Sequence, residues 1–143
     1  MTPITLETIN AEQSRLAAER EQIHFPETLI DLNPGEHYAG LIVGKDGEPS
    51  YHLILLPGEA ENVTFDTAKK WAASIGGDLP TRLELALLWQ NCRDQFEKSW
   101  YWSNESSEAG WAWYQHFYYG FQTSHHVRQD YQLRARAVRR LPI

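Results

Sequence analysis

Two short helical segments lie back to back in the middle of the chain, and they constrain the fold more than any other feature. The stretch TFDTAKKWAASIGG opens at Thr64, which suits a helix N-cap, and Asp66 suits the positive end of the helix dipole. Its apolar residues share one face: Phe65, Ala68, Ala72 and Ile75. Because Gly76 and Gly77 follow, we expect the helix to end there.

The second helix begins shortly after the two glycines. Thr81 and Glu84 have the spacing of a capping box, in which each side chain accepts a hydrogen bond from the other residue's backbone N–H. The run LELALLW that follows is apolar around most of the helix circumference, which predicts a helix buried in the domain.

Segments with strand character flank the two helices. Residues 38–43 and 51–56 are rich in β-formers and are separated by a turn sequence containing Asp46 and Gly47, which predicts a hairpin. The continuous apolar run of residues 53–56 predicts a central strand covered on both faces. Residues 111–120 alternate in polarity, and residues 133–141 close the chain as one strand, over which a helix can pack at Ala135 and Ala137. The order of elements predicts an α+β domain over residues 37–143.

Residues 1–36 are expected to form an N-terminal helix followed by a linker. The helical stretch has a heptad-like stripe of Leu6, Ile9, Leu16 and Ile23, interrupted by Gln13 and Arg20. Two alternatives remain open: a helix that forms a homo-oligomer, or a helix that docks on its own domain.

Composition excludes several classes of protein. The net charge of −6 over 143 residues argues against general nucleic-acid binding. Cys92 is the only cysteine, so neither an intrachain disulfide nor a thiolate metal cluster is expected. The N-terminus lacks the features of a cleaved signal peptide, and no apolar run is long enough for a membrane span. These features predict a soluble protein without membrane association.

An aromatic stretch, YWSNESSEAGWAWYQHFYYGFQ, spans residues 101–122. If residues 111–118 form a strand, Trp111, Trp113 and Phe117 share one face, and we expect them in the core. The opposite face carries Tyr114, His116 and Tyr118, whose apolar rings and polar tips suit a recognition surface. Packing beneath the next loop is the alternative for that face.

No metal site or catalytic motif is predicted. Asn104, Glu105 and Glu108 supply oxygen ligands but match no calcium-loop spacing, so a solvated loop is favoured. The adjacent His125 and His126 lack a second ligand cluster. The sequence contains no nucleophile elbow, phosphate loop or metalloprotease helix. We therefore expect a non-enzymatic protein without a cofactor.

The motifs FDTAKKWAASIGGDLPTRLELALLW, YWSNE, AWYQHFYYG and RARAVRRL occur in this order. Together they resemble a bacterial and phage domain-of-unknown-function family with a C-type-lectin-like fold, the family of the C-terminal domain of the Legionella collagen-like adhesin. The resemblance covers about residues 38–141. It implies two helices packed on antiparallel sheets and a loop region used for recognition. The chain lacks the calcium-binding triplets and the disulfides of sugar-binding lectins, so calcium-independent binding is expected.

The resemblance implies a phage- or prophage-associated recognition module that binds a protein or glycan, in the host cytosol or in the virion. Two alternatives stay open: a cytosolic accessory protein that inhibits a host protein, and a virion tail, receptor-binding or diversified display protein. The expected ligand-binding surface comprises Asn104, Glu105, Glu108, Tyr114, His116, Tyr118, His125, His126 and Arg128.

Overall fold

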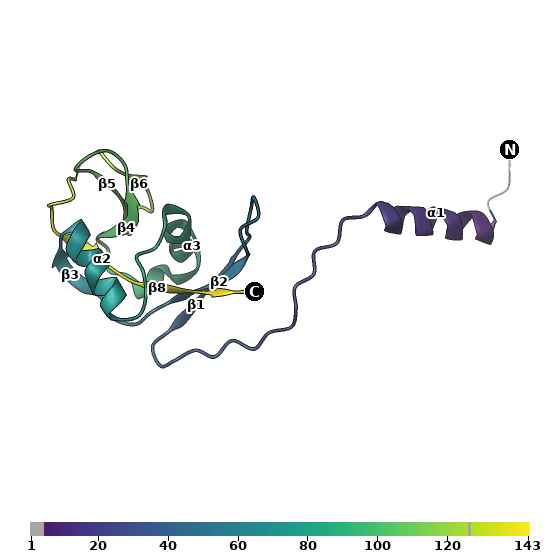
Figure 1. Ribbon diagram of the computed structural model, residues 1–143, viewed down its shortest axis with the longest axis horizontal. Coiled ribbons are helices and arrows are strands. Elements are labelled where there is room, and N and C mark those ends of the chain that lie inside the picture. Colours follow the sequence, from purple (N-terminus) through teal and green to yellow (C-terminus); the bar gives the residue numbers. More distant parts are fainter. Residues whose placement is uncertain (1–4, 126) are drawn as a thin grey trace.

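The computed structural model describes residues 5–125 and 127–143 (Figure 1). Helix α1 (Leu6–Glu19) stands apart at the N-terminal end, and an extended segment joins it to a domain that starts with strand β1 (His37–Ile42). The domain contains helices α2 (Phe65–Ser74) and α3 (Arg82–Cys92) and a short 3-10 turn, η1 (Arg93–Gln95). The α+β class predicted from the sequence is confirmed.

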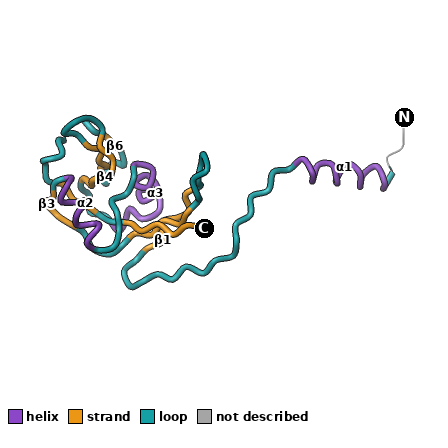
Figure 2. Tube along the Cα trace, in the orientation of Figure 1, coloured by secondary structure: helices purple, strands orange, loops and turns teal. Residues whose placement is uncertain are grey.

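Two sheets form the β-structure (Figure 2). The smaller has the order β1-β2-β8, with β2 (Tyr51–Leu55) between β1 and β8 (Val138–Pro142). The larger has the order β3-β7-β4-β5-β6 and comprises β3 (Ala60–Val63), β7 (Leu133–Ala135), β4 (Trp100–Ser106), β5 (Ala112–His116) and β6 (Gln122–Thr123). The expectation of purely antiparallel sheets was wrong at one pair, because β4 and β7 run parallel.

The predicted hairpin is confirmed, with β1 and β2 antiparallel. Its turn is closed by a 3.0 Å hydrogen bond from the Glu48 N–H to the Lys45 carbonyl. Asp46 and Gly47, the central residues of that turn, both have positive φ, as a tight hairpin turn requires. The central place of β2 is confirmed as well, because Leu53, Ile54 and Leu55 are fully buried although successive side chains point to opposite faces.

The C-terminal stretch forms two strands rather than the single strand expected. Residues Leu133–Ala135 pair in the larger sheet and Val138–Pro142 in the smaller one, so the chain changes sheets at Arg136 and Ala137. The Arg136 side chain is buried at this crossing and donates to the carbonyls of Leu56 (2.9 Å) and Gln95. These two hydrogen bonds hold the crossing segment to Leu56 and Gln95, which are far from it in the sequence.

Helix α2 packs against the larger sheet through small residues. Ala68 and Ala72 of the helix lie in one buried cluster with Ala135 and Ala137. The helix can therefore pack closely over the strand segment, as the small side chains of Ala135 and Ala137 predicted. The helix begins at the Thr64 cap and ends in a Schellman motif at the two glycines, with the Gly77 N–H bonded to the Ala72 carbonyl at 2.9 Å. Ile75 is exposed rather than buried, because the helix has already ended at Ser74.

Helix α3 packs against the smaller sheet and begins at the predicted capping box. Thr81 Oγ1 accepts from the Glu84 N–H at 3.1 Å, and Glu84 accepts from the Thr81 N–H at 2.8 Å. Leu85 and Leu88 lie in a buried cluster with Leu53 and Leu55 of β2. The predicted start of this helix is confirmed, but its predicted burial holds for one face only: Leu85, Leu88 and Cys92 are buried, whereas Leu83 and Ala86 are exposed.

Glu84 is more than a helix cap, because its side chain is fully buried. Its carboxylate accepts hydrogen bonds from Arg140 Nε (2.7 Å), Arg140 Nη2 (2.8 Å) and the Tyr51 hydroxyl (2.6 Å). Arg140 also donates to Asp78 at 2.8 Å. Burial raises the pKa of Glu84, but the bonds from Arg140, Tyr51 and the Thr81 backbone outweigh it, so the pKa lies below its usual 4.5.

The apolar stripe of α1 is not covered by the domain. Leu6, Ile9 and Leu16 are exposed on the helix, and Ile23 is exposed beyond its end. The docked arrangement, one of the two alternatives from the sequence, is therefore absent from the described part of this chain. None of the described helices is long and apolar enough to cross a membrane.

Replacing the buried carboxylate tests the Glu84–Arg140 pair. We expect Glu84→Gln to lower the free energy of unfolding by about 3 kcal/mol at neutral pH, because Arg140 loses its buried counter-charge. Since the folded-state pKa of Glu84 is depressed, its stabilising effect is present above about 4.5 and is lost as the pH falls. Urea unfolding at neutral pH and at about pH 3 should show a smaller acid-induced loss for Glu84→Gln than for the wild type. Glu12→Gln, on exposed α1, is the matched control, and equal unfolding curves for both variants would contradict the role of Glu84.

The uncovered stripe of α1 predicts self-association. We expect the full chain to form a species larger than a monomer, and deletion of residues 1–24 to leave a folded monomer, because no apolar partner covers the stripe within residues 5–125 and 127–143. Multi-angle light scattering measures both masses. Leu16→Asp should act like the deletion and Glu12→Gln should not. A monomeric full-length chain would rule out pairing through α1.

Candidate functional site

The residues expected to form the site divide between the two ends of the β4–β5 pair. In the antiparallel register, Trp100 lies opposite His116 at one end, and Ser106 lies opposite Ala112 at the other. The two ends are about 20 Å apart along the strand. Asn104, Glu105 and Glu108 therefore do not share a surface with His116 and Tyr118.

The polar residues at the Ser106 end take part in the domain's own hydrogen bonds. Asn104 donates to the Asp78 carboxylate at 3.2 Å, and Glu105 accepts from the Arg82 N–H at 2.6 Å, in the first turn of α3. The carbonyl of Glu108 accepts from the Trp111 N–H at 2.9 Å and closes the β4–β5 turn. The Glu105 carboxylate is thus already bound to the start of a helix, whereas the Glu108 side chain is exposed.

The predicted inward and outward faces were right for Phe117, which is buried, and for Tyr118, which is exposed, but wrong for three residues at or beside β5. Tyr114 is only 2% exposed and packs in the core between the larger sheet and α2, whereas Trp111 and Trp113 are half-buried. Each tryptophan lies under an arginine: Arg82 is 3.5 Å from the Trp113 ring centroid, and Arg128 is 5.3 Å from that of Trp111. A guanidinium stacked on an indole shields the ring from water and interacts favourably with it, so these two tryptophans can lie near the surface.

The remaining predicted residues are His125, His126 and Arg128. His125 is exposed, Arg128 is bound to Trp111 as described, and His126 lies outside the described residues. Within residues 5–125 and 127–143, no three histidine, cysteine, aspartate or glutamate side chains come together in a way that suits a metal ion.

At the opposite end of β4 and β5, a group of aromatic rings faces solvent. We call it the aromatic surface, and it comprises Trp100, His116, Tyr118, Tyr119 and Phe121. The exposed fractions of Tyr118, Tyr119 and Phe121 are 51%, 71% and 49%. The His116 ring is stacked with both Tyr119 and Phe121 at 5.3 Å between centroids and lies 5.7 Å from Trp100. The exposed rings thus form one continuous patch with His116 at its centre.

His116 also fixes the backbone of the surface. Its Nδ1 lies 3.0 Å from the backbone nitrogen of Tyr118 and 3.2 Å from that of Tyr119 and accepts hydrogen bonds from both. An Nδ1 that accepts two bonds carries no proton, so the ring proton is assigned to Nε2. The aromatic surface therefore includes one imidazole N–H donor.

Two buried contacts with α3 hold the surface from below. Phe117 is buried against Trp89 and is stacked with Phe96 at 3.9 Å between centroids. Gly120 has φ 85° and closes the turn through a 2.7 Å bond from its N–H to the His116 carbonyl. A Cβ at Gly120 would lie 2.5 Å from Trp89, so only glycine fits there.

The sequence prediction included His116 and Tyr118 but missed Trp100, Tyr119 and Phe121. The missed signal is Gly120, which marks a turn and ends the strand alternation soon after His116. Once the chain turns, neighbouring aromatic side chains no longer point alternately to opposite faces of a sheet.

A cavity of about 550 Å³ lies between the β1–β2 hairpin and α3. Its lining includes Ile42, Val43, Tyr51 and Leu83. Its charged residues point to no common ligand: Arg140 is already bound to Glu84, and Lys45 and Glu48 belong to the hairpin turn.

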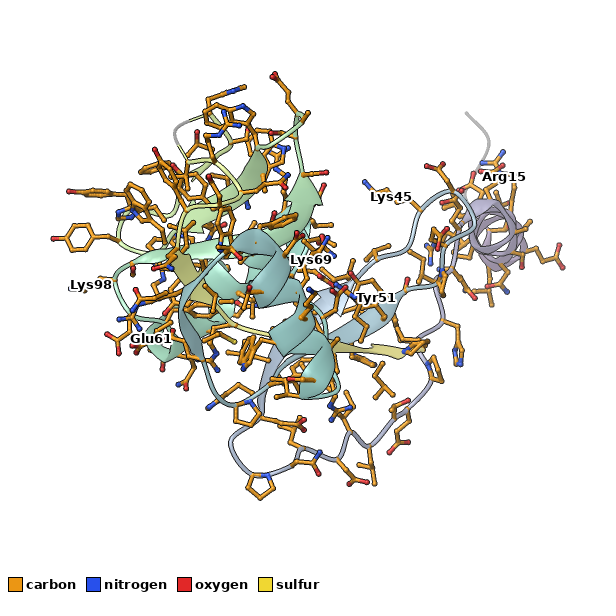
Figure 3. The ribbon with its side chains drawn as sticks, turned by 60° about the vertical axis from the view of Figure 1, so that its left-hand side comes forward. Arg15, Lys45, Tyr51, Glu61, Lys69 and Lys98 are labelled. Atoms are coloured by element: carbon orange, nitrogen blue, oxygen red, sulfur yellow. The ribbon has the colours of Figure 1, made fainter. Side chains whose placement is uncertain are left out.

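Figure 3 shows Lys45 on the side that faces Arg15 of α1, while Lys98 and Glu61 lie on the opposite side of the domain. Lys98 lies 5.2 Å from the Tyr118 ring centroid, so the aromatic surface is on that opposite side.

Substituting Gly120 tests whether the turn depends on Trp89. We expect Gly120→Ala to lower the free energy of unfolding by about 1–3 kcal/mol more than Gly76→Ala, because both have positive φ but only Gly120 meets a neighbouring side chain. Thermal denaturation measures both values. Equal losses for the two variants would show that the turn does not pack on Trp89.

In comparisons with protein-family models and with curated proteins, nothing matches the chain.

Proposed function

We propose that the protein is a non-enzymatic recognition module that binds a protein or glycan through the aromatic surface. The observation that carries the proposal is the continuous patch of exposed rings centred on His116. Contiguous exposed apolar patches mark interaction sites, and aromatic residues are enriched at interfaces.

The chemistry of the patch suits recognition. Tyrosine and tryptophan provide large contact areas with few rotatable bonds, so they lose little conformational entropy on binding. The Tyr118 and Tyr119 hydroxyls and His116 Nε2–H add polar groups, and Lys98 over Tyr118 adds a positive charge at the rim. Because Phe117 and Gly120 fix the turn from below, the rings are arranged before a ligand arrives.

The C-type-lectin-like fold remains part of this proposal and is supported by two helices packed on two sheets. Binding without calcium is supported by the use of Asn104 and Glu105 to hold Asp78 and the start of α3. We place the module in a phage or prophage setting, in the host cytosol or the virion, from the resemblance of its motifs.

A second candidate function is a virion tail or receptor-binding component. The exposed stripe of Leu6, Ile9 and Leu16 favours it, because a self-associating helix would present several aromatic surfaces at once. A monomeric accessory protein that inhibits a host protein would not need that stripe.

Loss of one exposed ring tests the main proposal. We expect Tyr119→Ala to reduce partner binding at least about tenfold, as removal of an aromatic residue does at the centre of an interface, while the melting temperature stays close to that of wild type. The measurement is capture of host-lysate proteins and glycans on the immobilised protein, followed by titration of the captured partner. Phe25→Ala, which removes an exposed ring from the linker, is the matched control. Undiminished binding by Tyr119→Ala would contradict the proposal.

A further inference from the structure

A polar cavity lies beside the aromatic surface and shares Trp100 with it. Its volume is about 350 Å³, within the range of small-molecule sites. It is formed where β3, β7 and the start of β4 meet, and its polar lining comprises Asn62, Lys98, Ser99, Gln132 and Arg134. Leu133 adds a small apolar area.

Three of the lining side chains have unused hydrogen-bonding groups. In the described part of the chain, the side chains of Asn62, Ser99 and Gln132 make no hydrogen bond with any protein atom. Two amides and one hydroxyl can both donate and accept, so the cavity offers both kinds of partner.

The backbone of β3 is distorted at this cavity. Between the pairs Ala60–Ala135 and Val63–Leu133, β3 has one residue more than β7, which is a β-bulge. Asn62, inside the bulge, has φ 53°, a conformation that is uncommon for a residue other than glycine. Bulges of this kind redirect a side chain, and here the redirected residue is one of the free amides.

The charges around the cavity balance. Arg134 is held by Glu59 at 2.6 Å and by Glu61 at 3.0 Å. Lys98 supplies a second positive charge and is not ion-paired within the described residues. Two carboxylates and two cations leave no net charge, which disfavours a strongly charged ligand.

Trp100 provides a flat wall. Its indole is stacked with the buried ring of Tyr114 at 5.3 Å between centroids, with an angle of 28° between the planes. The orientation of Trp100 is therefore set by the core of the domain. The faces of an aromatic ring carry partial negative charge and attract polarised C–H groups.

We propose that this cavity binds one uncharged saccharide residue, with its C–H face on Trp100 and its hydroxyls on Asn62, Ser99 and Gln132. A pyranose has both a flat C–H face and several hydroxyls that donate and accept. This assignment rests on the proposed recognition function and identifies the ligand class at one end of the aromatic surface. The neighbouring rings of His116 and Tyr119 would contact the next part of a longer glycan.

The test uses neutral monosaccharides as probes on the full-length protein. Saturation-transfer NMR with glucose, galactose, mannose and N-acetylglucosamine, followed by titration, gives the affinity for each, with glucuronic acid as the charged comparison. We expect at least one neutral sugar to bind and to bind more tightly than glucuronic acid.

Two substitutions remove the cavity's free amides with little risk to the fold. Asn62→Gly keeps the positive φ, and Gln132→Ala changes an exposed side chain. Each should weaken sugar binding about five- to tenfold, the effect of one lost hydrogen bond. Gln90→Ala, which removes an exposed amide from α3, is the matched control and should leave binding unchanged.

Binding of no neutral sugar, a preference for glucuronic acid, or equal affinity in wild type, Asn62→Gly and Gln132→Ala would each overturn the saccharide assignment. If Asn62→Gly and Gln132→Ala bind the captured partner as tightly as the wild type does while Tyr119→Ala does not, the recognition function stands and only the saccharide assignment fails. If Tyr119→Ala captures its partner as well as the wild type does, the recognition function itself fails.

Discussion

The buried carboxylate of Glu84 determines how the domain is assembled. A charge without solvent is costly unless donors surround it, and here Arg140, Tyr51 and the Thr81 N–H supply them. The donors come from β8, β2 and the start of α3, and Arg140 also bonds to Asp78. Burial and the bond to Glu84 raise the pKa of Tyr51 to about 12, so its hydroxyl stays a donor. Helix α3 therefore lies on the smaller sheet only when the C-terminal strand is in place.

The position of α3 in turn sets the larger sheet and the aromatic surface. Gln115 of β5 donates to the Leu85 carbonyl at 3.1 Å, and Gln122 of β6 donates to the Arg82 carbonyl at 2.6 Å. On the same helix, Trp89 packs edge-to-face against Phe117 and lies so close to position 120 that only glycine fits there. One helix thus carries the ion pair at its start and the support for the exposed rings further along. This arrangement explains how a surface built on a turn can be rigid.

The sequence predicted the elements whose signals are local. Caps, the Asp46–Gly47 turn and the end of α2 depend on residues only a few positions apart, so they could be identified from the sequence. Strand alternation, in contrast, separates two faces without showing which is inward. On β5 both faces are covered. Tyr114 packs with the small alanines of α2, while on the other face Gln115 is buried against α3 and Arg82 covers Trp113. The change of sheets at Arg136 also depends on contacts distant in sequence, with Leu56 and Gln95.

The same distinction applies to the predicted site, whose residues divide between hydrogen bonds within the domain and an exposed surface. Asn104 and Glu105 belong to the structure that positions α3, so a ligand there would compete with the domain's own hydrogen bonds. Tyr118, Tyr119 and Phe121 are 51%, 71% and 49% exposed, whereas Phe117 is buried in the core cluster next to α3. Exposed apolar rings without a structural task contribute little to folding, and their contact area is realised only against a partner. The proposed recognition function therefore depends on the His116 end of β4 and β5, where these rings are exposed.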